Sequence, residues 1–143
     1  MKEMTYQEII DLYGECIFAP VGKSMLPLIR EGLDTVRLIK VNRPFKKYDV
    51  ILYQRANGQF VLHRIVRVHQ QGLYLMGDNQ WSIERDVDPK QVIALMSGIY
   101  RQEKYIPCTS LPYRLYARRR VCFRWGRKFI YVIKRFGKKI LKK

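Results

Sequence analysis

A serine in this 143-residue chain has the surroundings that nucleophilic catalysis requires. Ser24 lies in the segment 22–27 (GKSMLP), where Gly22 lets a substrate backbone approach closely and Pro27 fixes the chain leaving the bend. A constrained bend can expose a hydroxyl and leave backbone N–H groups free for an oxyanion. We therefore interpret Ser24 as a candidate nucleophile, with Gly22, Met25 and Pro27 beside the approaching substrate. The alternative is a turn serine that forms only local hydrogen bonds.

A serine nucleophile needs a base, and His63 is the candidate. It lies in the segment 60–68 (FVLHRIVRV), which has the composition of a strand. Alternation puts His63 on one face with Val61 and Ile65, both apolar. A buried, neutral imidazole with a lowered pKa is suited to general-base catalysis. The alternative is a structural histidine with no part in chemistry.

A third group should orient the histidine, and three carboxylates follow it in the sequence. Asp78 lies in a turn-like Gly-Asp-Asn segment at 77–79, and Glu84 and Asp86 come shortly after it. Asp78 ranks first because its segment is intact, and Glu84 ranks second. Aspartates are common in turns, so a purely structural role is the alternative.

These segments together resemble the signal peptidase I superfamily, which also includes the LexA-type self-cleaving repressors. The similar segments occur in the family's order and span about residues 20–101: SMLP at 24–27, YDVI at 48–51, HRIV at 63–66 and GDN at 77–79. Most bacterial members use a lysine base. The histidine in HRIV resembles the endoplasmic-reticulum type and its bacterial relatives.

The resemblance implies a serine endopeptidase that removes leader or signal segments. His63 would take the proton of Ser24, and the Ser24 amide would stabilise the oxyanion before water releases the acyl group. It implies no metal and no cofactor, and a preference for a small residue just before the cleaved bond.

The chain also departs from the family pattern at three positions. Tyr48 stands where the family has glycine, and Gly22 stands where many relatives have a hydroxyl that assists the oxyanion. The family's second acidic position falls on Glu84 or Arg85, one residue before Asp86. The acid that orients the histidine is therefore left open among the three carboxylates.

The patterns around these residues predict a mainly β fold, a compact antiparallel unit with a helix at each end. Thr5 and Glu8 form a capping-box pattern that predicts a helix over 5–16. Apolar runs separated by turn signals, including Asn57-Gly58, predict the strands listed here: 35–40, 50–54, 60–68, 73–76 and 92–100. We expect an N-terminal helix (1–19), a peptidase domain (20–106) and a basic amphipathic C-terminal helix (107–143).

The positive charge is concentrated in this last segment. Residues 113–143 carry 13 of the basic side chains and no acidic one, which leaves +3 of the formal net charge of +16 for the rest of the chain. One stripe of apolar residues recurs at helical spacing over 113–141. Such a segment indicates an anionic partner.

We expect that partner to be an anionic membrane surface. The aromatic side chains of Trp125, Phe129 and Phe136 would enter the headgroup region while Lys128 and Arg135 meet the lipids. A solvated helix packed on the body is the alternative. Nucleic acid is a weaker candidate, because phosphate binding does not require the aromatic stripe.

The remaining composition excludes several classes of protein. Three cysteines without a CxxC spacing and two histidines argue against a disulfide framework or a zinc site. No run of 18 or more apolar residues predicts a membrane span, and the N-terminus lacks the pattern of a signal peptide. We therefore expect a peripheral protein on the cytoplasmic side. Two alternatives to the peptidase remain, an inactive peptide-binding module and a LexA-like regulator.

Overall fold

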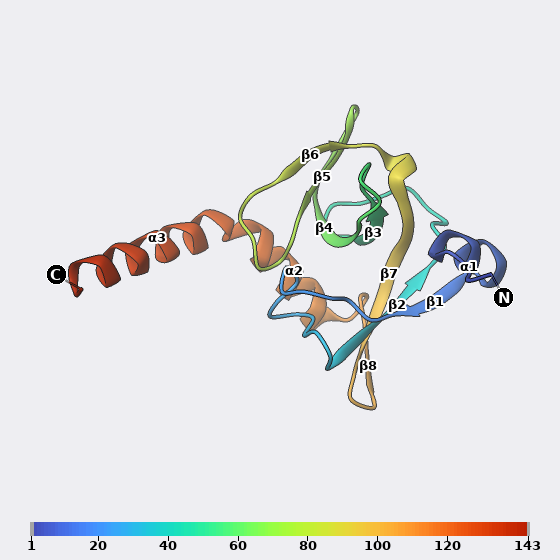
Figure 1. Ribbon diagram of the computed structural model, residues 1–143, viewed down its shortest axis with the longest axis horizontal. Helices are drawn as coiled ribbons and strands as arrows, with labels where there is room; N and C mark the ends of the chain where they lie inside the picture. The colour runs from blue at the N-terminus through green and yellow to red at the C-terminus, as the bar shows by residue number, and fades with distance from the viewer. Residues whose placement is uncertain (1, 143) are drawn as a thin grey trace.

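An antiparallel sheet organises the computed structural model, which describes residues 2–142 (Figure 1). Its eight strands are β1 (Glu15–Phe18), β2 (Asp34–Ile39), β3 (Val50–Gln54), β4 (Phe60–His69), β5 (Gly72–Met76), β6 (Glu84–Val87), β7 (Val92–Arg101) and β8 (Lys104–Pro107). The helices are α1 (Tyr6–Tyr13), the 3-10 turn η1 (Pro89–Gln91), α2 (Leu111–Cys122) and α3 (Arg124–Ile140). The prediction of a mainly β, antiparallel unit is confirmed.

Strand β7 lies at the centre of the sheet. The strand order is β1-β2-β7-β3-β4-β5-β6, and β8 pairs with the outer half of β7. Leu95 of β7 is paired with Ile39 of β2 on one side and with Ile51 of β3 on the other. Strands β1 and β2 lie on either side of the candidate nucleophile in the sequence, and β4 carries the candidate base. In the sheet, β7 therefore joins the first pair of strands to β3 and β4.

The N-terminal helix is shorter than the sequence pattern predicts. The capping box is present, because Thr5 Oγ1 accepts the Glu8 amide and the Glu8 carboxylate accepts the Thr5 amide. The helix ends at Gly14, whose φ of +78° is the left-handed conformation that glycine adopts at helix ends. The prediction of helix to residue 16 is wrong, since the chain passes directly into β1 and pairs with β2.

The predicted hairpins are present, with small shifts of the strand ends. Gly58, at φ +88°, lies in the turn between β3 and β4, where its amide donates to the Arg55 carbonyl. Gly72 opens β5 at the next turn, and a Cβ there would lie 2.8 Å from the Asp86 backbone. Strands β1, β6 and β8 had no separate signal in the sequence.

Both faces of the central strands are buried, and each belongs to a different core. Residues including Ile10, Met25, Leu38, Leu52, Leu62, Ala94 and Tyr113 form one core, beneath α1 and α2. Residues including Ile51, Tyr53, Val61, Ile65, Leu75 and Leu95 form the other, within the curled part of the sheet. The alternation predicted for β4 is confirmed, because Leu62 lies in the first core while Val61 and Ile65 lie in the second.

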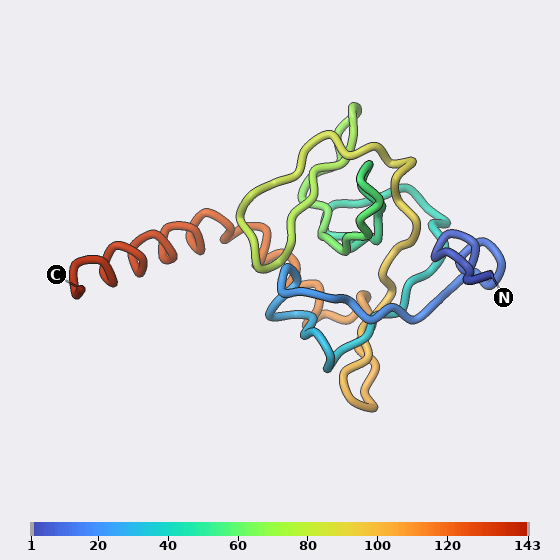
Figure 2. Tube along the Cα trace, viewed as in Figure 1, coloured from blue at the N-terminus to red at the C-terminus, as the bar shows by residue number. Residues whose placement is uncertain are grey.

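The basic C-terminal segment forms two helices instead of the single one predicted. The helical path is interrupted at Phe123, whose φ and ψ of −94° and 19° end α2 before α3 begins. α2 packs on the sheet through Tyr113 and Ala117, which are buried. α3 leaves the body and projects away from it (Figures 1 and 2).

α3 contacts the body with its polar side. Arg127 donates to the Asp78 carbonyl at 2.6 Å, and the Tyr131 ring packs on Trp81 with 4.7 Å between ring centroids. At about 100° per residue, the apolar side chains fall on the other side of the helix. They are exposed, with relative accessibilities of 65% for Trp125 and 66% for Phe129. The alternative in which the apolar stripe packs on the body is therefore not found for α3.

Candidate active site

Ser24 and His63 line the same open cavity, of about 480 Å³. One wall is the chain that follows β1 and leads into the Ser24 bend, and the opposite wall is the start of β4. Aromatic rings close one end, where Tyr6 of α1 stands edge-on to Phe18 and Phe60. The cavity therefore brings together the two groups that the sequence places 39 residues apart.

The Ser24 bend is held in place by the Gly-Asp-Asn segment at 77–79. The Asn79 amide donates to the Ser24 carbonyl at 2.8 Å, and Asn79 Nδ2 donates to the Lys23 carbonyl at 3.1 Å. A Cβ on Gly77 would lie 2.6 Å from the Ser24 carbonyl oxygen, closer than real Cβ contacts come. The close approach of the two segments thus requires a glycine at position 77. The conformation of the Ser24 bend is held by its contacts with residues 77–79.

The Ser24 bend leaves its own polar groups available. Gly22 has φ +96°, and a Cβ there would meet nothing within 4 Å, which is consistent with an open approach to the serine. Within residues 2–142, no hydrogen bond occupies the Ser24 amide or the Ser24 hydroxyl, and none joins Ser24 to His63. An unoccupied amide in a rigid bend is a suitable donor for an oxyanion.

His63 is buried, with 5% of its surface exposed. Burial, assisted by the positive charge of Arg55, lowers its pKa from 6.5 to about 4, against the opposing effect of Glu84. The imidazole is consequently neutral at physiological pH, which is the state that a base requires.

Tyr53 and Glu84 provide the polar surroundings of the imidazole. The Tyr53 hydroxyl lies 3.3 Å from His63 Nδ1 and donates to Glu84 Oε2 at 2.5 Å. Arg55 donates to the same carboxylate oxygen at 3.0 Å. Although burial opposes it, the hydrogen bonds from Arg55 and Tyr53 hold the pKa of Glu84 below its usual value.

These contacts indicate which imidazole nitrogen carries the proton. A tyrosine hydroxyl has one hydrogen, and Tyr53 gives it to Glu84. Toward His63 the hydroxyl can then only accept, so the hydrogen belongs on Nδ1. Nε2 of His63 is left with its lone pair, as in a general base.

Asp78, ranked first from the sequence, has different partners. Its carboxylate forms a buried, two-pronged ion pair with Arg64, at 2.7 and 2.8 Å, and accepts from the Tyr116 hydroxyl at 2.9 Å. Both side chains of the pair have no exposed surface. No hydrogen bond links Asp78 to His63 in the described chain. The ranking of the carboxylates therefore changes, and Glu84, acting through Tyr53, takes the first place.

The remaining candidates are spread over several environments. Met25 is buried behind the bend, and its sulfur lies 3.4 Å from the Asp78 amide. Pro27 faces away from the cavity of Ser24, toward α2 and α3. Asp86 is exposed in β6 with φ +55°. Neither Pro27 nor Asp86 lines the cavity of Ser24 and His63.

Tyr53 and Arg55 were not found by sequence reasoning. The signal was present in the hairpin register, because the Asn57-Gly58 turn pairs Ile51 with His63 and thereby puts Tyr53 on the same face as the histidine. A second cavity, of about 250 Å³, joins His63, Arg55 and Glu84.

Residues 2–142 contain no cluster of three or more His, Cys, Asp or Glu side chains suited to hold a metal ion. Within the same residues, no helix combines the length and apolar character that crossing a bilayer would take.

Comparison with known proteins adds no relative. No protein-family model, no curated protein and no solved structure matches the chain.

Proposed function

We propose that the protein is a serine endopeptidase of the signal-peptidase type, with Ser24 as nucleophile and His63 as base. The observation that carries the proposal is the neutral, buried His63 with its Nε2 lone pair free, in the cavity that Ser24 also lines. The order of the segments that resemble the signal peptidase I superfamily supports it.

In the proposed reaction, Nε2 of His63 takes the Ser24 proton as Oγ attacks a peptide carbonyl. The Ser24 amide binds the resulting oxyanion, and the imidazolium then gives its proton to the leaving amine. Water, deprotonated by the same imidazole, hydrolyses the acyl-enzyme and regenerates the serine. Tyr53 holds the imidazole, and Glu84 stabilises the positive charge that develops on it.

The cavity suits an extended polypeptide. It is open and runs between residues 19–23, which lead into the Ser24 bend, and the start of β4. A leader or signal segment with a small residue before the cleaved bond is the proposed substrate. The superfamily resemblance supplies that preference.

We also place the protein at the cytoplasmic surface of a membrane, held there by α3. The support is the helix orientation, because the body contacts the polar side of α3 and leaves the apolar side uncovered. Amphipathic helices of soluble proteins normally bury that side against their own core.

The test is labelling by a serine-directed acylating probe in the presence of anionic vesicles. Wild type should be labelled, and Ser24→Ala and His63→Ala should not. The control Ser97→Ala changes a serine of β7 that lines neither cavity of His63, and it should behave as wild type. A folded wild-type protein that resists labelling would contradict the proposal and favour a peptide-binding module on the same scaffold.

A further inference from the structure

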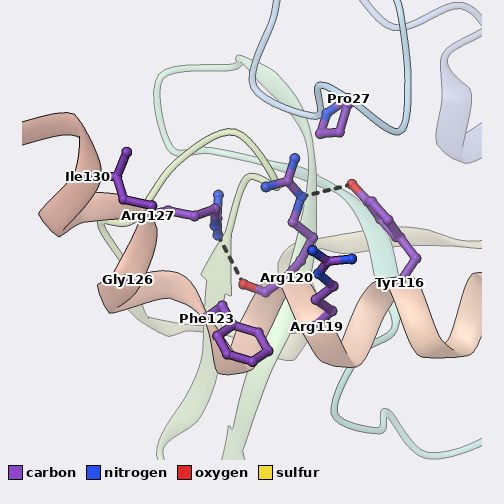
Figure 3. Close-up of a pocket in the computed structure, with 8 residues that line it drawn as sticks. All are labelled: Pro27, Tyr116, Arg119, Arg120, Phe123, Gly126, Arg127 and Ile130. Carbon is purple, nitrogen blue, oxygen red and sulfur yellow. Dashed lines mark hydrogen bonds between the residues drawn. The ribbon is translucent and has the colours of Figure 1, made fainter. Parts of the chain in front are cut away.

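A further cavity, of about 500 Å³ and distinct from the two beside His63, lies between Pro27 and the junction of α2 and α3 (Figure 3). Pro27 forms one side of this junction groove. The other side carries three arginines, Arg119 and Arg120 at the end of α2 and Arg127 in the first turns of α3. No acidic residue lines it.

The positive charges in the junction groove are incompletely balanced. Arg127 uses its terminal nitrogens on the carbonyls of Asp78 and Arg120, while its Nε is buried without a hydrogen-bond partner. Arg120 forms a long hydrogen bond, 3.4 Å, to the Tyr116 hydroxyl, and its guanidinium lies 5.7 Å from the centre of the same ring; neither partner carries a negative charge. Within residues 2–142, the Arg119 side chain has no ion pair.

The nearest buried carboxylate cannot supply the missing negative charge. Tyr116, which lines the groove, donates its hydroxyl hydrogen to the Asp78 carboxylate. Both oxygens of that carboxylate already accept hydrogen bonds from Arg64. Burial lowers the pKa of Arg127, and the repulsion of Arg120 adds to the effect. An anion entering the groove would relieve this repulsion.

The same groove is apolar along its floor. Phe123 and Ile130 line it and are both more than half exposed. Between them lies Gly126, where an added Cβ would meet nothing within 4 Å. Ile130 and Gly126 border the uncovered side of α3, so the groove continues directly into the apolar stripe that includes Phe129 and Phe136.

From this arrangement we propose that the junction groove binds one anionic phospholipid. The phosphate lies against Arg119 and Arg120, beside Arg127, and the acyl chains follow Phe123 and Ile130 onto the apolar side of α3. The inference rests on the proposed membrane location of α3 and is independent of Ser24 chemistry.

Charge favours a lipid over another copy of this chain. A second tail would bring a further 13 basic side chains without an acid against the same surface. A ligand with an anionic head and an apolar body can contact both the arginines and the apolar side chains of the groove. A free anion would contact only the arginines, and a wholly apolar segment only the apolar side chains.

The charge of the groove is tested with dihexanoyl phosphatidylglycerol, kept below its micelle concentration, and calorimetry on the full chain. R119Q/R120Q should weaken binding about tenfold or more. The matched control is R114Q/R118Q, which removes two charges from the same helix on the side that lines a different cavity. Equal weakening by both pairs would overturn the proposal.

The space in the groove is tested by two glycine substitutions that change no charge. Gly126→Leu fills the groove and should abolish binding, whereas Gly137→Leu, three turns later on the same face and equally open, should preserve it. Both replacements favour the helix, so neither should unfold it.

The class of ligand is tested by two further probes. Inorganic phosphate alone should bind far more weakly than the lipid. If phosphate or an acidic peptide binds as tightly as the lipid, or if no lipid binds, the proposal is overturned. Because Ser24→Ala should bind the lipid as wild type does, failure here is distinct from failure of the proposed peptidase activity.

Discussion

Tyr53 is the residue on which the assignment of the base depends. Its hydroxyl lies between the imidazole of His63 and the carboxylate of Glu84. Because it donates its hydrogen to Glu84, it can only accept from His63, and this favours the tautomer with the proton on Nδ1. It touches no reacting atom in the proposed reaction and is a positioning residue.

Tyr53→Phe should slow labelling of Ser24 by roughly tenfold, much less than loss of His63 itself would. The reason is that the phenylalanine ring keeps the packing but leaves Nδ1 without an acceptor. The pH dependence of labelling should also shift in this variant and stay unchanged in the control Tyr105→Phe. A rate loss with an unmoved pH profile would indicate a merely structural tyrosine.

His63 should also make the fold sensitive to acid. The unfolded chain binds a proton at His63 near pH 6.5, and the folded chain only near pH 4, so acid favours the unfolded state between those values. Of the groups around the ring, Arg55 reinforces this low pKa, and Glu84 and Asp78 oppose it.

Between pH 7 and pH 5, wild type should therefore lose about 2 kcal/mol more unfolding free energy than His63→Gln. Urea unfolding at the two pH values measures the difference. Parallel losses in both proteins would show that the pKa of His63 is not lowered by folding.

Among the secondary-structure elements, the sequence predicted the strands that have a strong local pattern. It did not predict the short strands that form only by pairing with a neighbouring strand. Alternation and the Asn57-Gly58 turn located β3 and β4, and their register then fixes the face of His63. β6 is short and charged, and β8 ends in proline, so both are strands only because β5 and β7 pair with them. Periodicity also could not reveal the interruption at Phe123.

The candidate site divides in the same way. The candidate nucleophile and candidate base were chosen from local segments of the sequence, whereas the candidate orienting acid could not be chosen in that way. The sequence ranked Asp78 above Glu84, and only the three-dimensional position of Arg64 shows that the Asp78 carboxylate is already engaged.

Gly77 tests whether the turn at 77–79 defines the Ser24 bend. Gly77→Ala should force the two segments apart, since a Cβ would lie 2.6 Å from the Ser24 carbonyl oxygen. We expect about 1–3 kcal/mol of lost stability and a larger proportional loss of Ser24 labelling. In the control Gly126→Ala, where space is open, both should be preserved. Full labelling of Gly77→Ala would contradict this role of the turn.

At the scale of the whole molecule, the body and α3 have different chemistry. The body is closed around two cores, while α3 presents aromatic and basic side chains outward (Figure 1). A peptidase held in this way would meet substrates that emerge at, or lie along, a membrane surface.

Replacing two exposed aromatics on α3 should separate membrane binding from folding. In F129S/F136S, binding to vesicles rich in phosphatidylglycerol should fall roughly 100-fold, because each ring contributes about 1.5–3 kcal/mol on burial. The unfolding free energy should be unchanged, since both side chains are exposed in the free protein.

The control for this experiment is L12S/L33S, two similarly exposed residues of the body. Cosedimentation should be unaffected in the control and should weaken with salt in wild type. Vesicle binding that survives in F129S/F136S would place the membrane contact elsewhere.

The central position of β7 has a consequence for synthesis of the protein. Strands β1 and β2, with the Ser24 bend between them, are joined in the sheet to the strands around His63 by β7, which ends at Arg101. On a ribosome, the sheet that brings Ser24 and His63 to one cavity therefore cannot be completed until β7 has emerged. Such late closure by long-range pairing is slow, and the proposed peptidase activity would require it to be complete.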